Sequence, residues 1–143
     1  MLLRIGLALG REGVLIQTLS RLTTCFLGGA AGTGRQYISW LHTHDLNEMF
    51  LWAIERPDVV GTFNATGPCP VTNSDFMRGM RRALNRPWTP TVPPWAVHIG
   101  ARLMGTQPEL ILTGRKCIPG RFAEIGFSFQ FPHLESALSD LFR

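Results

Sequence analysis

Gly32-Thr33-Gly34-Arg35-Gln36-Tyr37-Ile38-Ser39-Trp40-Leu41-His42-Thr43-His44-Asp45-Leu46-Asn47-Glu48, residues 32–48, passes from a glycine loop through a short apolar strand into a capped helix. The glycines let the backbone turn where a side chain would clash, and residues 38–41 are β-branched or large, which suits a pleated, half-buried strand. Asp45 can cap the following helix by accepting from free N–H groups while Glu48 reaches back, as in a capping box. The stretch predicts a strand that leads directly into a helix.

The predicted helix carries its apolar residues at helical spacing. They occupy positions i, i+3, i+4, i+7 and i+8, namely Leu46, Met49, Phe50, Ala53 and Ile54. Such a stripe is typical of a helix that packs one face against a core. We expect this helix to pack inward.

Strands and helices alternate on either side of this stretch. Residues 2–9 are an almost uninterrupted apolar run, as expected of a strand buried on both faces of a parallel sheet, and residues 59–66 predict a second buried strand. A helix is expected over 14–25, with an inner face made of Leu15, Thr18, Leu19 and Leu22. The alternation predicts an α/β layered fold.

A further helix is predicted after residue 72. Thr72 is placed to cap it, with Asp75 at the third position. Its inner stripe consists of Phe76, Met80, Ala83 and Leu84.

The glycine-rich loop 28–34 invites a phosphate-binding interpretation. Its glycines do not follow the G-x-G-x-x-G spacing, and the loop leads from a helix to a strand, the reverse of a dinucleotide-binding turn. We predict that it is a flexible connector.

A proline-rich linker over residues 87–94 divides the chain, because its prolines cannot continue a helix or a central strand. Residues 1–86 are predicted to form one lobe of strands and helices, and residues 95–143 a small, mainly helical C-terminal domain. Within this domain we expect helices over 95–104, 108–113 and 119–125, the last ending at Gly126, then a strand over 127–131 and a final helix opened by Pro132.

Composition narrows the class of protein. With 143 residues, 45% hydrophobic and 17% charged, the chain is globular, and no apolar stretch approaches the length of a membrane span. The net charge of +4 is carried almost wholly by arginine, without the aromatic interleaving of a nucleic-acid surface. The three cysteines are odd in number and far apart, which predicts neither a disulfide framework nor a zinc site and favours a cytoplasmic location.

Several motifs of the chain resemble a known family. Residues 34–42 with Asp45-Leu46, then residues 61–68 and 71–73, look like the epimerase-like branch of the extended short-chain dehydrogenase/reductases, the NAD(P)-dependent epimerase/dehydratase family. Residues 118–119, 126–129 and 131–138 are similar to the small domain that closes members of that branch. The resemblance covers nearly the whole chain but only the C-terminal half of the family, and it implies the C-terminal part of a Rossmann-like fold. Residues 1–86 would then be the late strands and helices of the NAD(P)-binding/substrate lobe.

The family's catalytic parts are not found in this sequence. Hydride transfer in the family depends on an N-terminal glycine-rich turn and on a Tyr-x-x-x-Lys pair, whereas Tyr37 is the only tyrosine here and is followed four places on by Leu41. No catalytic residue is therefore assigned. The resemblance implies NAD(P) as the cofactor of the complete enzyme, and we expect this chain alone to bind none.

Four residues are the candidates for lining a substrate: Arg35, Gln36, Trp40 and Asn64. An arginine can clasp a phosphate or carboxylate, and a tryptophan can stack on a planar ring or sugar face. The alternatives are that Trp40 packs in the core and that Arg35 is a loop residue that contacts only water. His42 and His44 lie two apart, but no third ligand supports a metal, and none is assigned.

The functional prediction is the substrate-side portion of an NAD(P)-dependent epimerase-like oxidoreductase, inactive alone. Its partners would be a small-molecule substrate and the missing N-terminal half, with no nucleic acid and no membrane. The alternative is a non-catalytic interaction or regulatory module that uses an arginine-rich helix, containing Arg78, Arg81, Arg82 and Arg86, and an exposed sheet edge.

Overall fold

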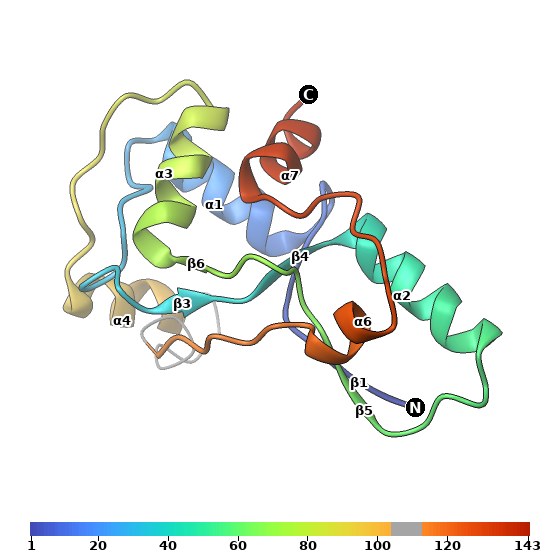
Figure 1. Cartoon of the computed structure of the whole chain (residues 1–143). Helices are drawn as coiled ribbons and strands as arrows, with labels where there is room; N and C mark the ends of the chain where they lie inside the picture. Colours follow the sequence, from blue (N-terminus) through green and yellow to red (C-terminus); the bar gives the residue numbers. More distant parts are fainter. Residues whose placement is uncertain (104–112) are drawn as a thin grey trace.

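Short parallel strands form the centre of the computed structural model, which describes residues 1–103 and 113–143 (Figure 1). Each strand pair joins segments that lie far apart in the sequence. Strand β1 (Leu2–Ile5) pairs with β5 (Thr62–Ala65), β2 (Leu7–Leu9) pairs with β4 (Trp40–His42), and β3 (Tyr37–Ile38) pairs antiparallel with β6 (Val71–Thr72).

The single strand predicted over residues 2–9 is two strands that meet at Gly6. The Gly6 N–H donates to Ala65 O at 3.0 Å, whereas the next N–H, that of Leu7, donates to Ser39 O at 2.8 Å. The run therefore changes its neighbour from β5 to β4 at Gly6. The expectation of burial on both faces is wrong for the first half, because Leu2 and Ile5 are exposed.

Helices pack around these strands. They are α1 (Val14–Thr24), α2 (Thr43–Glu55), α3 (Asn73–Ala83), α4 (Pro94–Leu103), α6 (Gly120–Glu124) and α7 (Leu134–Leu141). No helix in the described ranges has the length and apolarity needed to cross a bilayer. The predicted cap of α3 is confirmed, since the Thr72 hydroxyl accepts from the Asp75 N–H at 3.2 Å. The helix predicted over 95–104 corresponds to α4.

The predicted cap of α2 is wrong. The helix begins at Thr43, and His42 is its N-cap, with Nδ1 accepting from the His44 N–H at 3.1 Å. Asp45 lies inside the first turn and is 1% exposed. The imidazole accepts from one of the free N–H groups at the helix N-terminus, and the Asp45 carboxylate does not act as the cap.

Two predicted inner faces need correction. In α1 the buried residues are Ile16 and Thr23, and Leu22 is exposed, so the face that packs inward is rotated from the predicted one. In α2 only Asp45 and Met49 are buried, whereas Phe50 and Ile54 of the predicted stripe are exposed.

The glycine-rich loop packs as an ordered part of the fold. Ala31 forms a bridge with Val92, and the Val92 N–H donates to Ala30 O at 2.9 Å. The Asn73 side chain accepts from the Ala31 N–H at 2.8 Å. The prediction of a flexible connector is therefore wrong, because the loop's backbone groups are paired with the proline-rich segment and with α3.

The segment after α6 is extended but is not the predicted strand. Helix α6 ends before Gly126, whose φ of +77° confirms the glycine stop. Residues 127–131 form no ladder, because the N–H groups of Gln130 and Phe131 donate to a side-chain carboxylate instead. The last helix begins at Leu134 after His133, so Pro132 does not open it. The helix predicted over 108–113 falls almost entirely outside the described residues.

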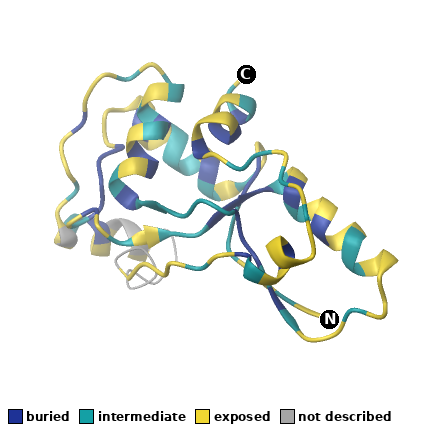
Figure 2. Ribbon diagram, in the orientation of Figure 1, coloured by how far each residue is buried: buried dark blue, intermediate teal, exposed yellow. Residues whose placement is uncertain are grey.

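Two hydrophobic clusters form the core. Figure 2 shows in dark blue where the buried residues lie along the ribbon. The first joins α7 to α1, α3, β2 and β4, and its buried members include Ile16, Trp40, Phe76 and Leu138. The second joins α6 to β4, β5 and α2 through Leu41, Phe63, Phe122 and Met49. Each cluster therefore combines residues from both sides of the proline-rich segment.

Candidate functional site

The hydroxyl of Ser39 connects segment 34–42 to the distant segment 113–118. These two segments together form one wall. The hydroxyl donates to Arg115 O at 2.7 Å and accepts from the Cys117 N–H at 2.8 Å. The segment 113–118 is thereby held against the linker between β3 and β4. Both bonds use backbone groups of the later segment, so the sequence of that segment gives no signal for them.

Asn64 meets the same segment from strand β5. Its Nδ2 donates to Ile118 O at 3.4 Å, and its backbone lies opposite Arg4 in the β1–β5 ladder. The segment 113–118 is therefore bonded to both Ser39 and Asn64. Asn64 lies near the carboxyl end of β5, the end of a parallel strand at which open α/β sheets bind ligands, whereas Ser39 directly precedes β4.

The remaining predicted substrate residues have different surroundings. Arg35 is exposed, and Gln36 Nε2 donates to Ala31 O at 2.9 Å. Trp40 is 1% exposed, belongs to the core and donates from its indole N–H to Cys69 O at 2.9 Å. Its ring could stack on a substrate only by leaving that core. The substrate-lining role of the four residues stays a prediction.

Positive charge gathers on this wall. Arg35, Arg115 and Lys116 are exposed, and Lys116 Nζ lies 4.9 Å from the centre of the Tyr37 ring, a cation–π contact. The segments 34–42 and 113–118 contain no Asp or Glu. The wall is therefore suited to a ligand that carries negative charge, and arginine can bind a carboxylate or phosphate through two N–H groups.

The glycine-rich loop does not fit the phosphates of a dinucleotide. A side-chain carbon added at Gly29 would collide with Pro90 O, and one added at Gly34 would collide with the Ser74 side chain. The space that glycine leaves open in a phosphate-binding turn is taken up here by the protein's own atoms. Among the described residues, the loop therefore offers no cradle for NAD(P).

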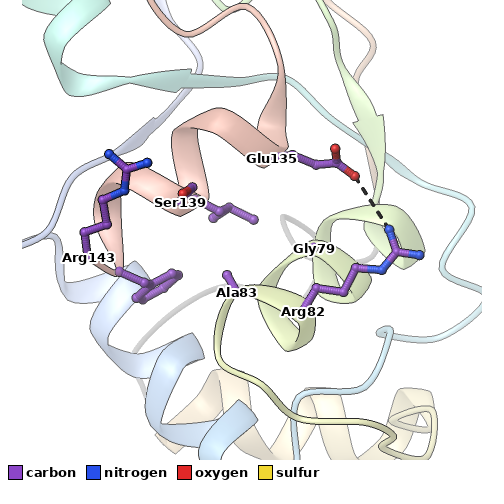
Figure 3. Close-up of a pocket in the computed structure, with 8 residues that line it drawn as sticks. Gly79, Arg82, Ala83, Glu135, Ser139 and Arg143 are labelled. Carbon is purple, nitrogen blue, oxygen red and sulfur yellow. Dashed lines mark ion pairs between the residues drawn. The ribbon is translucent and has the colours of Figure 1, made fainter.

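A separate cavity of about 380 Å³ lies between α3 and α7 (Figure 3). Arg82 and Glu135 form an ion pair of 3.6 Å at its rim, and Leu138 and Phe142 line it. None of the predicted substrate residues lines this cavity, and it lacks a buried titratable group. It does not form part of the candidate site.

His42 is the titratable group with the clearest perturbation. Burial lowers its pKa below the usual value, and the carboxylates of Asp140 and Asp45 oppose this effect. Nε2 lies 3.5 Å from the Asp140 carboxylate. Within residues 1–103 and 113–143, no group of three potential ligands gathers for a metal. The contact that His42 makes through Nδ1 is a structural one, because this atom caps α2.

Comparison with known proteins gives consistent matches. Residues 92–141 match a family model described as a domain of unknown function, DUF1731. An epimerase family protein of Staphylococcus aureus strain MRSA252 is 32% identical over 138 residues, which are 96% of this chain and 45% of that protein. A chloroplastic epimerase family protein of Arabidopsis thaliana, a homologue of SDR39U1, is 34% identical over 138 residues, covering 96% of this chain and 39% of its own length.

A solved structure agrees with these matches. The human epimerase family protein SDR39U1 (isoform 2), crystallised with NADPH, superposes with a TM-score of 0.86 at 30% identity. The match covers 97% of this chain and 46% of the human one. The predicted α/β, Rossmann-like fold is confirmed, and the chain spans less than half the length of the curated relatives it matches.

Proposed function

Because this chain corresponds to the C-terminal part of an epimerase family protein of the extended short-chain dehydrogenase/reductase type, we propose that it forms the substrate-side portion of an NAD(P)-dependent epimerase-like oxidoreductase. The observation that carries this proposal is the cationic wall in which segment 113–118 is bonded to Ser39 and to Asn64. Arg35, Gln36 and Asn64 would line the substrate there, with Trp40 supporting them from the core.

The substrate is proposed to be a small carbonyl compound with an anionic group. Arg35 is exposed on a segment without carboxylates, so a bound anion would meet no nearby like charge from that segment. Lys116, held over Tyr37, would add a second cation. Binding of this kind weakens as salt is added, because exposed charges are screened.

The chain is proposed to be inactive alone. It contains no Tyr-x-x-x-Lys pair, and its glycine-rich loop is filled by its own backbone and side chains. A titration with NADPH, followed by nicotinamide fluorescence, tests this directly. We expect no saturable binding below about 1 mM, the weak range near −4 kcal/mol; saturation in the micromolar range would overturn the assignment.

The substrate assignment is tested in a mixture with the cofactor-binding half of a relative. This chain is co-expressed with the N-terminal part of the Staphylococcus aureus protein, and NADPH oxidation is measured over a panel of anionic and neutral carbonyl compounds. We expect turnover of an anionic compound, which Arg35→Ala lowers at least tenfold while NADPH binding is unchanged. Arg21→Ala, an exposed arginine on α1, is the matched control. Equal turnover by the two variants would refute the role of Arg35.

The alternative function is a non-catalytic interaction module that binds a partner through the arginine-rich helix. Contacts within the chain occupy part of that helix. Three arginines of the arginine-rich helix have partners within the chain: Arg78 with Asp75 at 2.9 Å, Arg82 with Glu135 at 3.6 Å, and Arg81 with Gly28 O at 3.1 Å. The helix is therefore a poor anion-binding face. The free cysteines at positions 25, 69 and 117 support the proposed cytoplasmic location.

A further inference from the structure

The cavity between α3 and α7 has the size and lining of a small-molecule site (Figure 3). Its volume of about 380 Å³ lies within the range of about 300–1,000 Å³ that such sites occupy. Its lining combines apolar side chains with a few polar groups, a mixture that holds an apolar ligand and fixes its orientation. We call it the α3–α7 cavity.

The floor of this cavity is apolar and follows α7. Leu138, which is 1% exposed, forms it together with the half-buried Phe142 and Ala83. Gly79 contributes no side chain from α3, so the wall there is backbone. The lining on α7 runs from position 135 to position 142, about 10 Å at the helical rise of about 1.5 Å per residue. A chain-shaped apolar body therefore fits along the floor.

The rim carries more positive than negative charge. Two arginines, Arg82 and Arg143, line the cavity together with one carboxylate, that of Glu135. Figure 3 shows Arg82 and Glu135 at one end and Arg143 at the other, with Ser139 between them. Residues 76–103 contain no Asp or Glu, so the chain around α3 adds no opposing charge. The cavity is therefore suited to a ligand with an anionic group.

Arg82 differs from the other paired arginines of α3, because its partner is easily exchanged. Its Nη1 lies 3.6 Å from Glu135 Oε1, beyond the length of a hydrogen bond, and the two side chains are 71% and 82% exposed. Arg78, one turn earlier, instead donates a hydrogen bond to Asp75 at 2.9 Å. Exposed ion pairs contribute little, since water screens them. A ligand carboxylate that accepted two N–H groups from Arg82 would form the stronger contact.

We propose that the α3–α7 cavity binds a medium-chain carboxylate, whose apolar chain lies along α7 and whose carboxylate takes Arg82 from Glu135. The proposal goes beyond the proposed function, since none of the residues assigned to the substrate lines this cavity. A ligand that spans α3 and α7 requires both helices in place, so it binds the folded chain and stabilises it.

The test uses the intact chain with octanoate as the probe. The neutral 1-octanol has the same chain length, and acetate supplies the anionic group alone. Dissociation constants are measured from amide chemical shifts by nuclear magnetic resonance, and the midpoint of thermal unfolding is followed in parallel. We expect saturable binding of octanoate, with shifts confined to residues 79–83 and 135–143 and a raised midpoint. Both 1-octanol and acetate should bind at least tenfold more weakly.

Substitutions at exposed positions separate the contacts. Arg82→Gln removes the cation and should weaken octanoate binding at least tenfold. Glu135→Gln removes the competing carboxylate and should tighten binding at least threefold, a gain that a loss of folding does not produce. Arg78→Gln is the matched control on the same helix, outside the cavity, and should change the affinity less than twofold.

Four outcomes would overturn the proposal. Equal affinity for octanoate and 1-octanol would show that no group of the cavity recognises the carboxylate. Binding to Glu135→Gln that is no tighter than to wild type would refute the exchange at Arg82. Shifts spread over other apolar surfaces, such as residues 1–5 and 50–54, would indicate adsorption of the alkyl chain without a site. Finally, no saturation below about 10 mM would place the affinity below that of a specific site.

Discussion

Asp45 connects helix α2 to the C-terminal part of the chain through its carboxylate. Oδ1 accepts from the Gln130 N–H at 2.8 Å and Oδ2 from the Phe131 N–H at 3.0 Å, and the side chain is 1% exposed. Hydrogen bonds to a charged group contribute about 1.5–3 kcal/mol each, and the two N–H groups would lose their acceptor on truncation.

Truncating this carboxylate should be costly. We expect Asp45→Ala to lower the free energy of unfolding by about 3–5 kcal/mol, measured by urea denaturation. Asp58→Ala, at an exposed loop position, is the control and should cost less than about 0.5 kcal/mol. A loss at Asp45 no larger than that of the control would show that the two bonds do not stabilise the fold.

His42 should make stability depend on pH. Its pKa is lowered in the folded state, chiefly by burial, so the unfolded chain binds a proton more readily than the folded one. The stabilising contribution of neutral His42 is complete above the unfolded pKa of about 6.5 and is lost as pH falls toward the lower folded pKa. Protonation at Nδ1 would also remove the acceptor that caps α2.

The comparison of His42→Asn with wild type isolates this effect. Asparagine can still cap the helix but does not titrate, so we expect its free energy of unfolding to fall less steeply than that of wild type between pH 7 and pH 5. Urea denaturation at several pH values provides the measurement, with the exposed His133→Asn as control. If the two variants and wild type show parallel pH profiles, His42 does not titrate on unfolding in this range.

At the scale of elements, α7 is held by its packing on α3. Gly79 of α3 allows the close approach, since a side-chain carbon there would lie 3.0 Å from Leu138 Cδ1. Leu138 is 1% exposed, and shortening it leaves a cavity between the helices. Leu138→Ala should lower the free energy of unfolding by about 2–5 kcal/mol. The exposed Leu51→Ala should change it by less than about 0.5 kcal/mol in the same denaturation experiment; comparable losses would mean that α7 is not part of the stabilising core.

At the scale of the whole molecule, both hydrophobic clusters contain residues from the two predicted parts of the chain, 1–86 and 95–143. Trp40 and Leu41 are adjacent in β4 but belong to different clusters, and each cluster also contains residues from 120–141. We therefore expect one cooperative unfolding transition, with coincident far-UV and tryptophan-fluorescence curves. Two separate transitions, of which Leu138→Ala shifts only one, would support independent domains.

Local patterns in the sequence were enough to predict several features of the protein. The Thr72 cap, the Gly126 stop and the helical periodicity of the last helix depend on residues within a few positions of each other, and the motifs of residues 34–46 and 61–73 indicated the family and its α/β fold. These features are readable because helix caps and amphipathic stripes involve neighbours in sequence.

Tertiary structure alone decided the partners of Asp45 and Ser39. Asp45 and Gln130 are 85 positions apart, and Ser39 and Cys117 are 78 apart. A carboxylate in the first turn of a helix has the same local signature whether it caps that helix or binds a distant backbone, since both roles require only an acceptor. Which role it takes depends on which N–H groups the folded chain brings to it.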